Sequence, residues 1–525
     1  MSWGHALLLS FLVLALAAGG HTKSNTALLA RASVASSANV HYITRNGHTL
    51  MDGPNPLRFV SFNVPTLYNT GDVNGRPRSA PTAFEQYDLL RSVKINGGKV
   101  ARSYTFTVCC VGNDTDPNNF HMSGIGQYSE AVWRSTDAAI ALAGVEGVRL
   151  IIPFIDWWSY HGGVDEFAAF RGKQRWDFFT DQQLRQDFKT HISWVLERVN
   201  TVTGLKYKDD PTIMLWELGN ELGDWNGMLP PDWILDIAQH VKTGAPKQLV
   251  GDGLINQLTM LGELNPETKA AWAYNHTWKW DLMVKSGIMA SPNIDVFSDH
   301  YYNAQGANDW TTRAAAGVQY AINQFNKAFY VGEFGFEGPL TLGNMIDFVV
   351  DSGNVSGVAL WSLRGHSRFG GFYKHYERNS WFSYHIPGFA ASDEADGLCS
   401  NSDETTTMAL MRKAAAKING LEKPVAYPIP DQPYLFAPTG GPKPSFRWLG
   451  CAGVATYEVW RQSGSAPWMK LADGVSDGKA AGSALFVDDL SNAVCGTKYR
   501  YIVRGSGETG PGPFSAAVSY RACAT

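Results

Sequence analysis

Short apolar segments alternate with longer amphipathic stretches through most of this 525-residue chain, and this alternation is its strongest structural signal. Helix-like patterns, for example over residues 180–200 and 311–326, separate runs rich in β-branched and aromatic residues. The alternation is typical of βαβ units and a parallel sheet. Eight strands separated by helices favour a closed α/β fold, the (β/α)8 TIM barrel, over an open sheet, and we assign it residues 41–421. The predicted strands are 58–63, 99–104, 149–154, 213–220, 248–252, 296–302, 329–334 and 358–363.

Polar and aromatic side chains recur where these predicted strands end. In a barrel the carboxyl ends of all strands meet at one mouth, where active sites are built. Any one such residue could be a helix cap or a hydrogen-bonded core group. Eight at equivalent positions indicate a site instead, and they are Asn63, Arg102, Asn220, Glu221, His300, Tyr302, Glu333 and Trp361.

Two of these residues, Glu221 and Glu333, predict glycoside hydrolysis with retention. That reaction needs two carboxyl groups about 5–5.5 Å apart, one to protonate the leaving oxygen and one to attack the anomeric carbon. We predict Glu221 as acid/base and Glu333 as nucleophile, and the alternative for Glu221 is a helix cap. Glu217 lies deeper in its strand and is predicted to be a buried partner of Arg102.

These motifs resemble glycoside hydrolase family 5, over about residues 41–420. The segments RFVSFN, DWWSYHGG and YKDDPTIMLWELGNE are most similar to those of the family's endo-β-1,4-mannanases. The resemblance implies the same roles for Glu221 and Glu333. It also implies that Arg102 and Tyr302 keep Glu333 ionised, and that substrate contacts come from Arg102, Asn220, His300, Tyr302 and Trp361. The chain departs from many members at Leu222, where they have proline, which puts the shape of that loop in question.

Further aromatic residues follow predicted strands three and four. We predict Trp158 and Trp225 as substrate-binding platforms, with burial in the core as the alternative for each. The aromatic and histidine-rich segment 366–385 is predicted to form one wall of the cleft. Its histidines lack the short spacings of zinc sites, so we expect no catalytic metal and no cofactor.

The N-terminal residues predict export. Residues 6–18 are apolar and too short to span a bilayer, and Ala15-Leu16-Ala17 offers a small-x-small cleavage site, so 1–20 is predicted as a signal peptide. An uncleaved anchor is the alternative. Six cysteines and sequons at Asn113, Asn275 and Asn354 agree with a secreted, extracellular glycoprotein. Residues 21–40 are predicted to form a flexible arm.

A second, smaller region follows the barrel. The Pro/Gly-rich stretch 422–442 predicts a stiff linker. Short alternating runs over 443–525 predict an all-β sandwich that resembles a fibronectin type III module. This sandwich could act as a spacer or bind polysaccharide, and we favour the spacer.

The cysteines can pair in several ways. We expect a bridge between Cys495 and Cys523, which fall at one end of the predicted sandwich. Cys109 and Cys110 could form a vicinal disulfide or pair separately with Cys399 or Cys451.

The leading functional hypothesis is a secreted endo-β-1,4-mannanase acting by double displacement on polysaccharide. Alternatives are a β-1,4-glucanase or an exo-β-mannosidase on the same barrel, or a non-catalytic sugar-binding wall protein. The net charge of −4, without a basic patch, disfavours nucleic acid and anionic membranes as partners, and we expect a monomer.

Overall fold

The computed structural model describes residues 20–34, 37–71, 78–112, 114–223, 229–254, 278–302, 310–373, 376–377, 380–381, 383–389 and 404–523. The predicted signal peptide, apart from Gly20, lies outside these residues. So do Asn113, Trp225, Asn275 and Cys399. Among the described residues, no helix combines the length and the apolar character needed to cross a bilayer.

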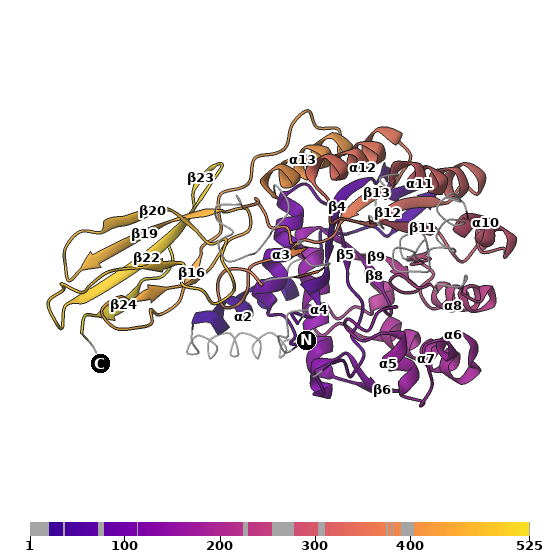
Figure 1. Ribbon diagram of the computed structural model, residues 1–525, viewed down its shortest axis with the longest axis horizontal. Coiled ribbons are helices and arrows are strands. Elements are labelled where there is room, and N and C mark those ends of the chain that lie inside the picture. Colours follow the sequence, from indigo (N-terminus) through magenta and orange to yellow (C-terminus); the bar gives the residue numbers. More distant parts are fainter. Residues whose placement is uncertain are drawn as a thin grey trace, which may run out of the picture.

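Eight parallel strands close into a barrel, which confirms the predicted fold (Figure 1). Around the barrel their order is β10-β11-β12-β13-β4-β5-β8-β9, so every strand pairs with its neighbours in the chain. All eight predicted strands are present with ends shifted by up to three residues. They are β4 (Phe59–Val64), β5 (Val100–Ser103), β8 (Arg149–Pro153), β9 (Ile213–Glu217), β10 (Leu249–Gly251), β11 (Val296–Tyr301), β12 (Ala328–Phe334) and β13 (Gly357–Leu360).

Helices cover the outside of the barrel, and both faces of the strands are therefore buried (Figure 1). This is why the strands are almost continuously apolar rather than alternating. The predicted helix over 311–326 is an α-helix followed by a π-helix, Val318–Gln324. The α-helices that follow β4 are α3 (Ala83–Ile95), α4 (Glu130–Glu146), α5 (Val164–Ala169), α6 (Asp177–Thr180), α7 (Gln182–Glu197), α8 (Pro231–Gly244), α10 (Trp278–Lys285), α11 (Trp310–Gly317), α12 (Pro339–Ser352) and α13 (Glu404–Ile418).

A hairpin formed by β1 (Ile43–Asn46) and β2 (Thr49–Asp52), extended by β3 (Asn55–Pro56), contributes to the core at the amino ends of the strands. Ile43 and Leu50 are buried in one cluster with Met214 and other residues of the strands. The interior is thus closed at this end, and the opposite, carboxyl end is left for a site.

The region before the hairpin differs from its prediction. Residues Gly20–Val34 form a helix, α2, where the composition indicated a flexible arm over 21–40. Ala32 is buried, and the helix contacts α3 and α4. Tertiary packing therefore orders a segment whose local sequence carries no strong helix signal.

The C-terminal region is built of antiparallel sheets, as predicted, and extends from one side of the barrel (Figure 1). Its main sheet has β19 (Thr456–Ser463), β20 (Met469–Ser476), β22 (Lys498–Gly507), β23 (Gly510–Pro511) and β24 (Val518–Arg521). Smaller pairs join β16 (Tyr434–Leu435) to β18 (Trp448–Leu449), and β17 (Ser445–Phe446) to β21 (Phe486–Val487). Trp448, Tyr457 and Tyr501 lie in its core. We call residues 434–523 the module.

The stretch 422–442, predicted as a stiff linker, packs against both the barrel and the module. Tyr427 is buried in the barrel core, where its hydroxyl donates to Asn96 Oδ1 at 3.1 Å. Further along, Leu435 of β16 belongs to the core of the module. The stretch therefore ties the two parts together.

His366 forms a charged contact between barrel and module. Its Nδ1 lies 2.9 Å from Asp88 Oδ2, on α3, and its Nε2 lies 3.0 Å from Asp477 Oδ2, in the module. Burial alone would lower the pKa of His366, but the two carboxylates outweigh it and raise the pKa to about 10. Nearby, the Phe372 N–H donates to Lys479 O at 2.8 Å. The described start of segment 366–385 therefore packs against the module, and the expectation that the segment forms one wall of the cleft stays a prediction.

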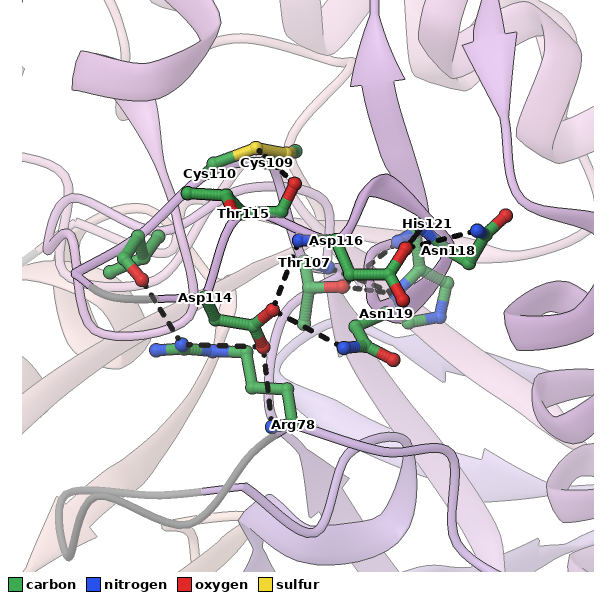
Figure 2. Close-up of a disulfide and its surroundings, with 11 residues drawn as sticks. Arg78, Thr107, Cys109, Cys110, Asp114, Thr115, Asp116, Asn118, Asn119 and His121 are labelled. Atoms are coloured by element: carbon green, nitrogen blue, oxygen red, sulfur yellow. Dashed lines mark hydrogen bonds and ion pairs between the residues drawn. A yellow bond between two sulfur atoms is a disulfide. The ribbon is translucent and has the colours of Figure 1, made fainter.

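Two disulfides are present in the part of the chain that the structure describes. Cys495 pairs with Cys523, as predicted, and Cys109 pairs with Cys110, the vicinal alternative. Figure 2 shows the vicinal disulfide beside a loop in which Asp114 accepts from the Arg78 N–H at 3.2 Å. Cys451 is buried and has no disulfide partner among the described residues.

Candidate active site

The eight predicted residues meet at the carboxyl end of the barrel, and all are buried. Asn63, Arg102, His300 and Glu333 lie on β4, β5, β11 and β12. The other four follow strands directly, Asn220 and Glu221 after β9, Tyr302 after β11 and Trp361 after β13. The structure therefore brings the eight predicted residues together at one end of the barrel, where strand ends converge.

Arg102 is the cation at the centre of this mouth. Its guanidinium donates to Glu333 Oε1 at 2.6 Å and to Glu217 Oε2 at 2.9 Å. It also donates to Asn220 Oδ1 at 2.9 Å and Asn63 Oδ1 at 3.2 Å. Glu217 is therefore the buried partner that the sequence predicted. Although burial opposes the charge, Glu217 and the other acidic groups around it raise the pKa of Arg102 well above its usual range. A permanent positive charge thus lies beside Glu333.

Glu333 accepts from two sides. Besides the Arg102 contact, the Tyr302 hydroxyl donates to its Oε2 at 2.6 Å. Burial raises the pKa of Glu333, and the charge of Glu221 raises it further, whereas His300, Arg102 and Tyr302 lower it. Arg102 and Tyr302 lower the pKa of Glu333, as predicted, but burial raises this pKa by more. Near pH 7, where His300 is neutral, ionisation of Glu333 therefore depends on Arg102 and Tyr302.

Glu221 is held by two other donors. His300 Nδ1 lies 2.7 Å from its Oε1, and the Trp158 indole N–H donates to its Oε2 at 2.6 Å. Burial lowers the pKa of His300 to about 4, so the imidazole is neutral near pH 7. Glu221 has φ of 53°, a left-handed conformation that is uncommon outside glycine and recurs at functional sites.

The two carboxyl groups face each other closely. One oxygen of Glu221 and one of Glu333 lie within 4.8 Å, together with a ring nitrogen of His300. A distance of at most 4.8 Å between one pair of oxygens is compatible with the retaining geometry of about 5 Å.

The same three residues could in principle hold a metal ion. Their surroundings argue against a cation. The guanidinium of Arg102 lies 2.6 Å from Glu333 and would repel one. Three of the four carboxyl oxygens also already accept from Arg102, Tyr302 and Trp158.

Glycines allow the close packing around these side chains. A Cβ added at Gly332 would lie 2.8 Å from His300 Nε2, and one at Gly335 would lie 2.7 Å from Trp361 O. At these two positions the absence of a side chain permits the close approach. At Leu222, the backbone N–H donates to Gly253 O at 3.2 Å, a bond that proline could not make.

The three tryptophans predicted to contact substrate have different surroundings. Trp361 is buried against Tyr104, with ring centroids 5.5 Å apart. Trp158 is half-buried and binds the acid/base candidate itself, a role that the platform prediction missed. Trp225 lies outside the described residues.

Sequence reasoning also missed Asp156 and Tyr104. Asp156 is fully buried beyond β8 and accepts from Asn220 Nδ2 at 3.0 Å. The Tyr104 hydroxyl lies 3.4 Å from the same nitrogen. An acidic residue between apolar ones just after a predicted strand, as in FIDWW, was the available signal for Asp156.

A family model described as "GH family 5 beta-mannosidase-like" matches residues 115–265, which include Asn220 and Glu221. Mannan endo-1,4-beta-mannosidase 1 of Solanum lycopersicum is 26% identical over 351 residues, covering 61% of this chain and 83% of the tomato protein. The chain is therefore similar in sequence to a family 5 glycoside hydrolase model and to mannan endo-1,4-beta-mannosidases.

Other family 5 relatives align over shorter segments. Mannan endo-1,4-beta-mannosidase 7 of Arabidopsis thaliana is 32% identical over 228 residues, which cover 40% of this chain and 51% of that protein. A protein of Oryza sativa is 40% identical over 136 residues, only 28% of its length. The chain thus spans about half or less of these two relatives.

Solved structures share the fold. The endo-beta-1,4-mannanase from Thermotoga petrophila superimposes with a TM-score of 0.52 at 18% identity, covering 90% of this chain and 99% of that one. A glycoside hydrolase family 5 mannosidase from Rhizomucor miehei gives the same TM-score at 18% identity over 72% of this chain.

Proposed function

We propose that this chain is an endo-β-1,4-mannanase that cleaves its polysaccharide with retention of configuration. The observation that carries the mechanism is the separation of at most 4.8 Å between oxygens of Glu221 and Glu333 at the barrel mouth. The substrate class rests on the names of the plant relatives, which are mannan endo-1,4-beta-mannosidases.

In the first step Glu221, as the acid, donates its proton to the glycosidic oxygen. The Glu333 carboxylate attacks the anomeric carbon, the bond to the leaving oxygen breaks, and a glycosyl ester forms on Glu333. Arg102 and Tyr302 hold the attacking carboxylate in place by their hydrogen bonds.

In the second step Glu221, now a carboxylate, takes a proton from water. The resulting hydroxide attacks the anomeric carbon from the opposite face, and the ester bond to Glu333 breaks. The contacts of Glu221 with His300 and Trp158 keep it oriented in both steps.

One experiment tests the substrate and the mechanism separately. The purified chain is assayed on mannan, glucomannan, carboxymethyl cellulose and xylan, and the sizes of the products distinguish endo from exo cleavage. We expect oligosaccharides from mannan. Turnover of cellulose alone would contradict the substrate class and leave the mechanism standing. Glu333→Ala should abolish hydrolysis in a folded protein, and full activity of that variant would overturn the nucleophile assignment.

Three further features belong to this proposal. The apolar N-terminus and the even number of cysteines support secretion into an extracellular, oxidising compartment. Asn354 is the one sequon among the described residues and would carry a glycan there. The module is proposed to be fibronectin type III-like and to act as a structural support, because it packs on the barrel through His366.

A further inference from the structure

The side-chain amide of Asn220 is oriented from both ends. Its Oδ1 accepts from Arg102 Nη2 at 2.9 Å, and its Nδ2 donates to Asp156 Oδ1 at 3.0 Å. Turning the amide over would place an N–H against the guanidinium and an oxygen against the carboxyl group. The contact with Arg102 would then be repulsive, and the bond from Nδ2 to Asp156 Oδ1 would be lost, so the pair of neighbours selects one orientation of the amide.

The backbone fixes Asp156 in this position. The Asn220 N–H donates to Ile155 O at 2.7 Å, and the Trp157 N–H donates to Asn220 O at 3.0 Å. These bonds join the loop after β8 to the loop after β9. A Cβ added at Gly163 would lie 2.2 Å from Asp156 O, so the loop also closes tightly behind this residue. The spacing between Asp156 and Asn220 is therefore set by the fold rather than by a mobile side chain.

We propose that Asp156 is a positioning residue that fixes the amide of Asn220 so that an N–H of Asn220 donates to the sugar hydroxyl beside the scissile bond. This inference rests on the proposed glycosidase function. Because that hydrogen bond strengthens in the transition state, its loss lowers kcat more than it raises KM.

The state of the Asp156 carboxyl group suits this role. Burial raises its pKa to about 8, and the charge of Glu221 raises it too, against hydrogen bonds from Asn220, Tyr104 and the Trp158 backbone that lower it. The group is therefore neutral near pH 6. It offers a carbonyl oxygen to Asn220 without adding a negative charge beside Glu221. An amide at this position would provide the same acceptor.

The test is a double-mutant cycle between positions 156 and 220, run on whichever polysaccharide the wild type hydrolyses. Asp156→Leu removes the acceptor at similar volume, and Asp156→Asn keeps it. We expect Asp156→Leu to lose about 10–100-fold in kcat with KM changed by less than about threefold. In Asp156→Asn we expect a loss below about threefold. In the Asn220→Ala background, Asp156→Leu should have no further effect, because its partner is gone.

A matched control is Asp252→Asn, a buried carboxyl group at the end of neighbouring strand β10 that bonds Ser298 rather than Asn220. Its effect should add to that of Asn220→Ala. The inference is overturned if Asp156→Leu costs as much in the Asn220→Ala background as in the wild type, or if Asp156→Asn is as impaired as Asp156→Leu.

If Asp156→Leu does not fold, Asp156→Ala replaces it in the same cycle, with thermal midpoints measured for every variant. A wild type that hydrolyses none of the polysaccharides contradicts the proposed function. An active wild type with an additive cycle contradicts only the role of Asp156.

Discussion

Two buried histidines, His300 at the barrel mouth and His366 between barrel and module, have opposite charge states. His300 directs one nitrogen at Glu221, 2.7 Å away, and the pKa of His300 falls to about 4 through burial and the nearby Arg102. His366 places one nitrogen against each of two carboxylates, and its pKa rises to about 10. A buried imidazole thus keeps its proton where each nitrogen has a carboxylate of its own and no other cation competes.

The two regions also differ in how their buried charges affect stability. At the mouth, Glu333 and Glu221 lie within 4.8 Å of each other and burial raises the pKa of Glu333, which costs stability. At the interface, the charges of Asp88 and Asp477 are balanced by His366, which favours stability. We expect variants at the mouth to change catalysis and variants at the interface to change unfolding.

The largest expected effect is on catalysis, from Glu333→Gln. Loss of the nucleophile should lower kcat by at least about 10⁴-fold. Removal of one of two facing carboxylates should leave the free energy of unfolding unchanged or about 1 kcal/mol higher. Initial rates and urea denaturation measure the two quantities, and a clearly destabilised variant would contradict the comparison.

The second largest expected effect is a loss of stability in His366→Leu. This variant leaves Asp88 and Asp477 buried without their cation, and removing one member of such a group costs about 3–5 kcal/mol. Urea denaturation should show the loss. The folded variant should keep kcat within about threefold. His48→Gln, at a partly exposed position bonded to Asn326, is the matched control and should change stability by less than about 0.5 kcal/mol. Equal stability of the two variants would contradict a stabilising role of His366 at the interface.

Tyr302→Phe should have an intermediate effect that appears in the pH profile. The hydroxyl lowers the pKa of Glu333, so its removal raises that pKa and leaves less carboxylate at acidic pH. The acidic limb of kcat/KM should move to higher pH, and kcat should fall about 10-fold. A profile that falls uniformly without shifting would mean that Tyr302 acts through packing alone.

The smallest effect is the pH dependence of stability at the interface. The folded pKa of His366 is about 10, above its unfolded value of about 6.5. Its contribution should therefore be complete below about pH 6.5 and be lost as the pH rises towards 10. The free-energy difference between the wild type and His366→Leu should shrink over this range, and a constant difference would contradict a charged imidazole.

The sequence predicted the barrel and its mouth because both follow from local signals. Strands such as Phe59–Val64 are continuous apolar runs, and residues such as Glu333 stand out as charges within them. The exposed strand Met469–Ser476 was missed because its side chains show no alternation of buried and exposed positions.

Contacts between distant parts of the chain carry no such signal. Asp88 and Asp477 lie 278 and 111 residues from His366, and nothing near His366 in the sequence indicates them. Asp156 was missed for a related reason, since its role depends on an amide 64 residues away. The order of residues along a strand is local information, whereas the partner of a buried charge is set by the folded chain.

The short loop that follows β13 has a practical consequence for dissecting this protein. Trp361, at the mouth, and His366, at the interface, belong to the same few residues, and both are buried. An engineer who cut the chain within 422–442 to obtain a minimal barrel would strip Asp477 from His366 and disturb the loop that carries Trp361. A chimera of two related chains should therefore take residues 361–373 and the module from the same parent chain.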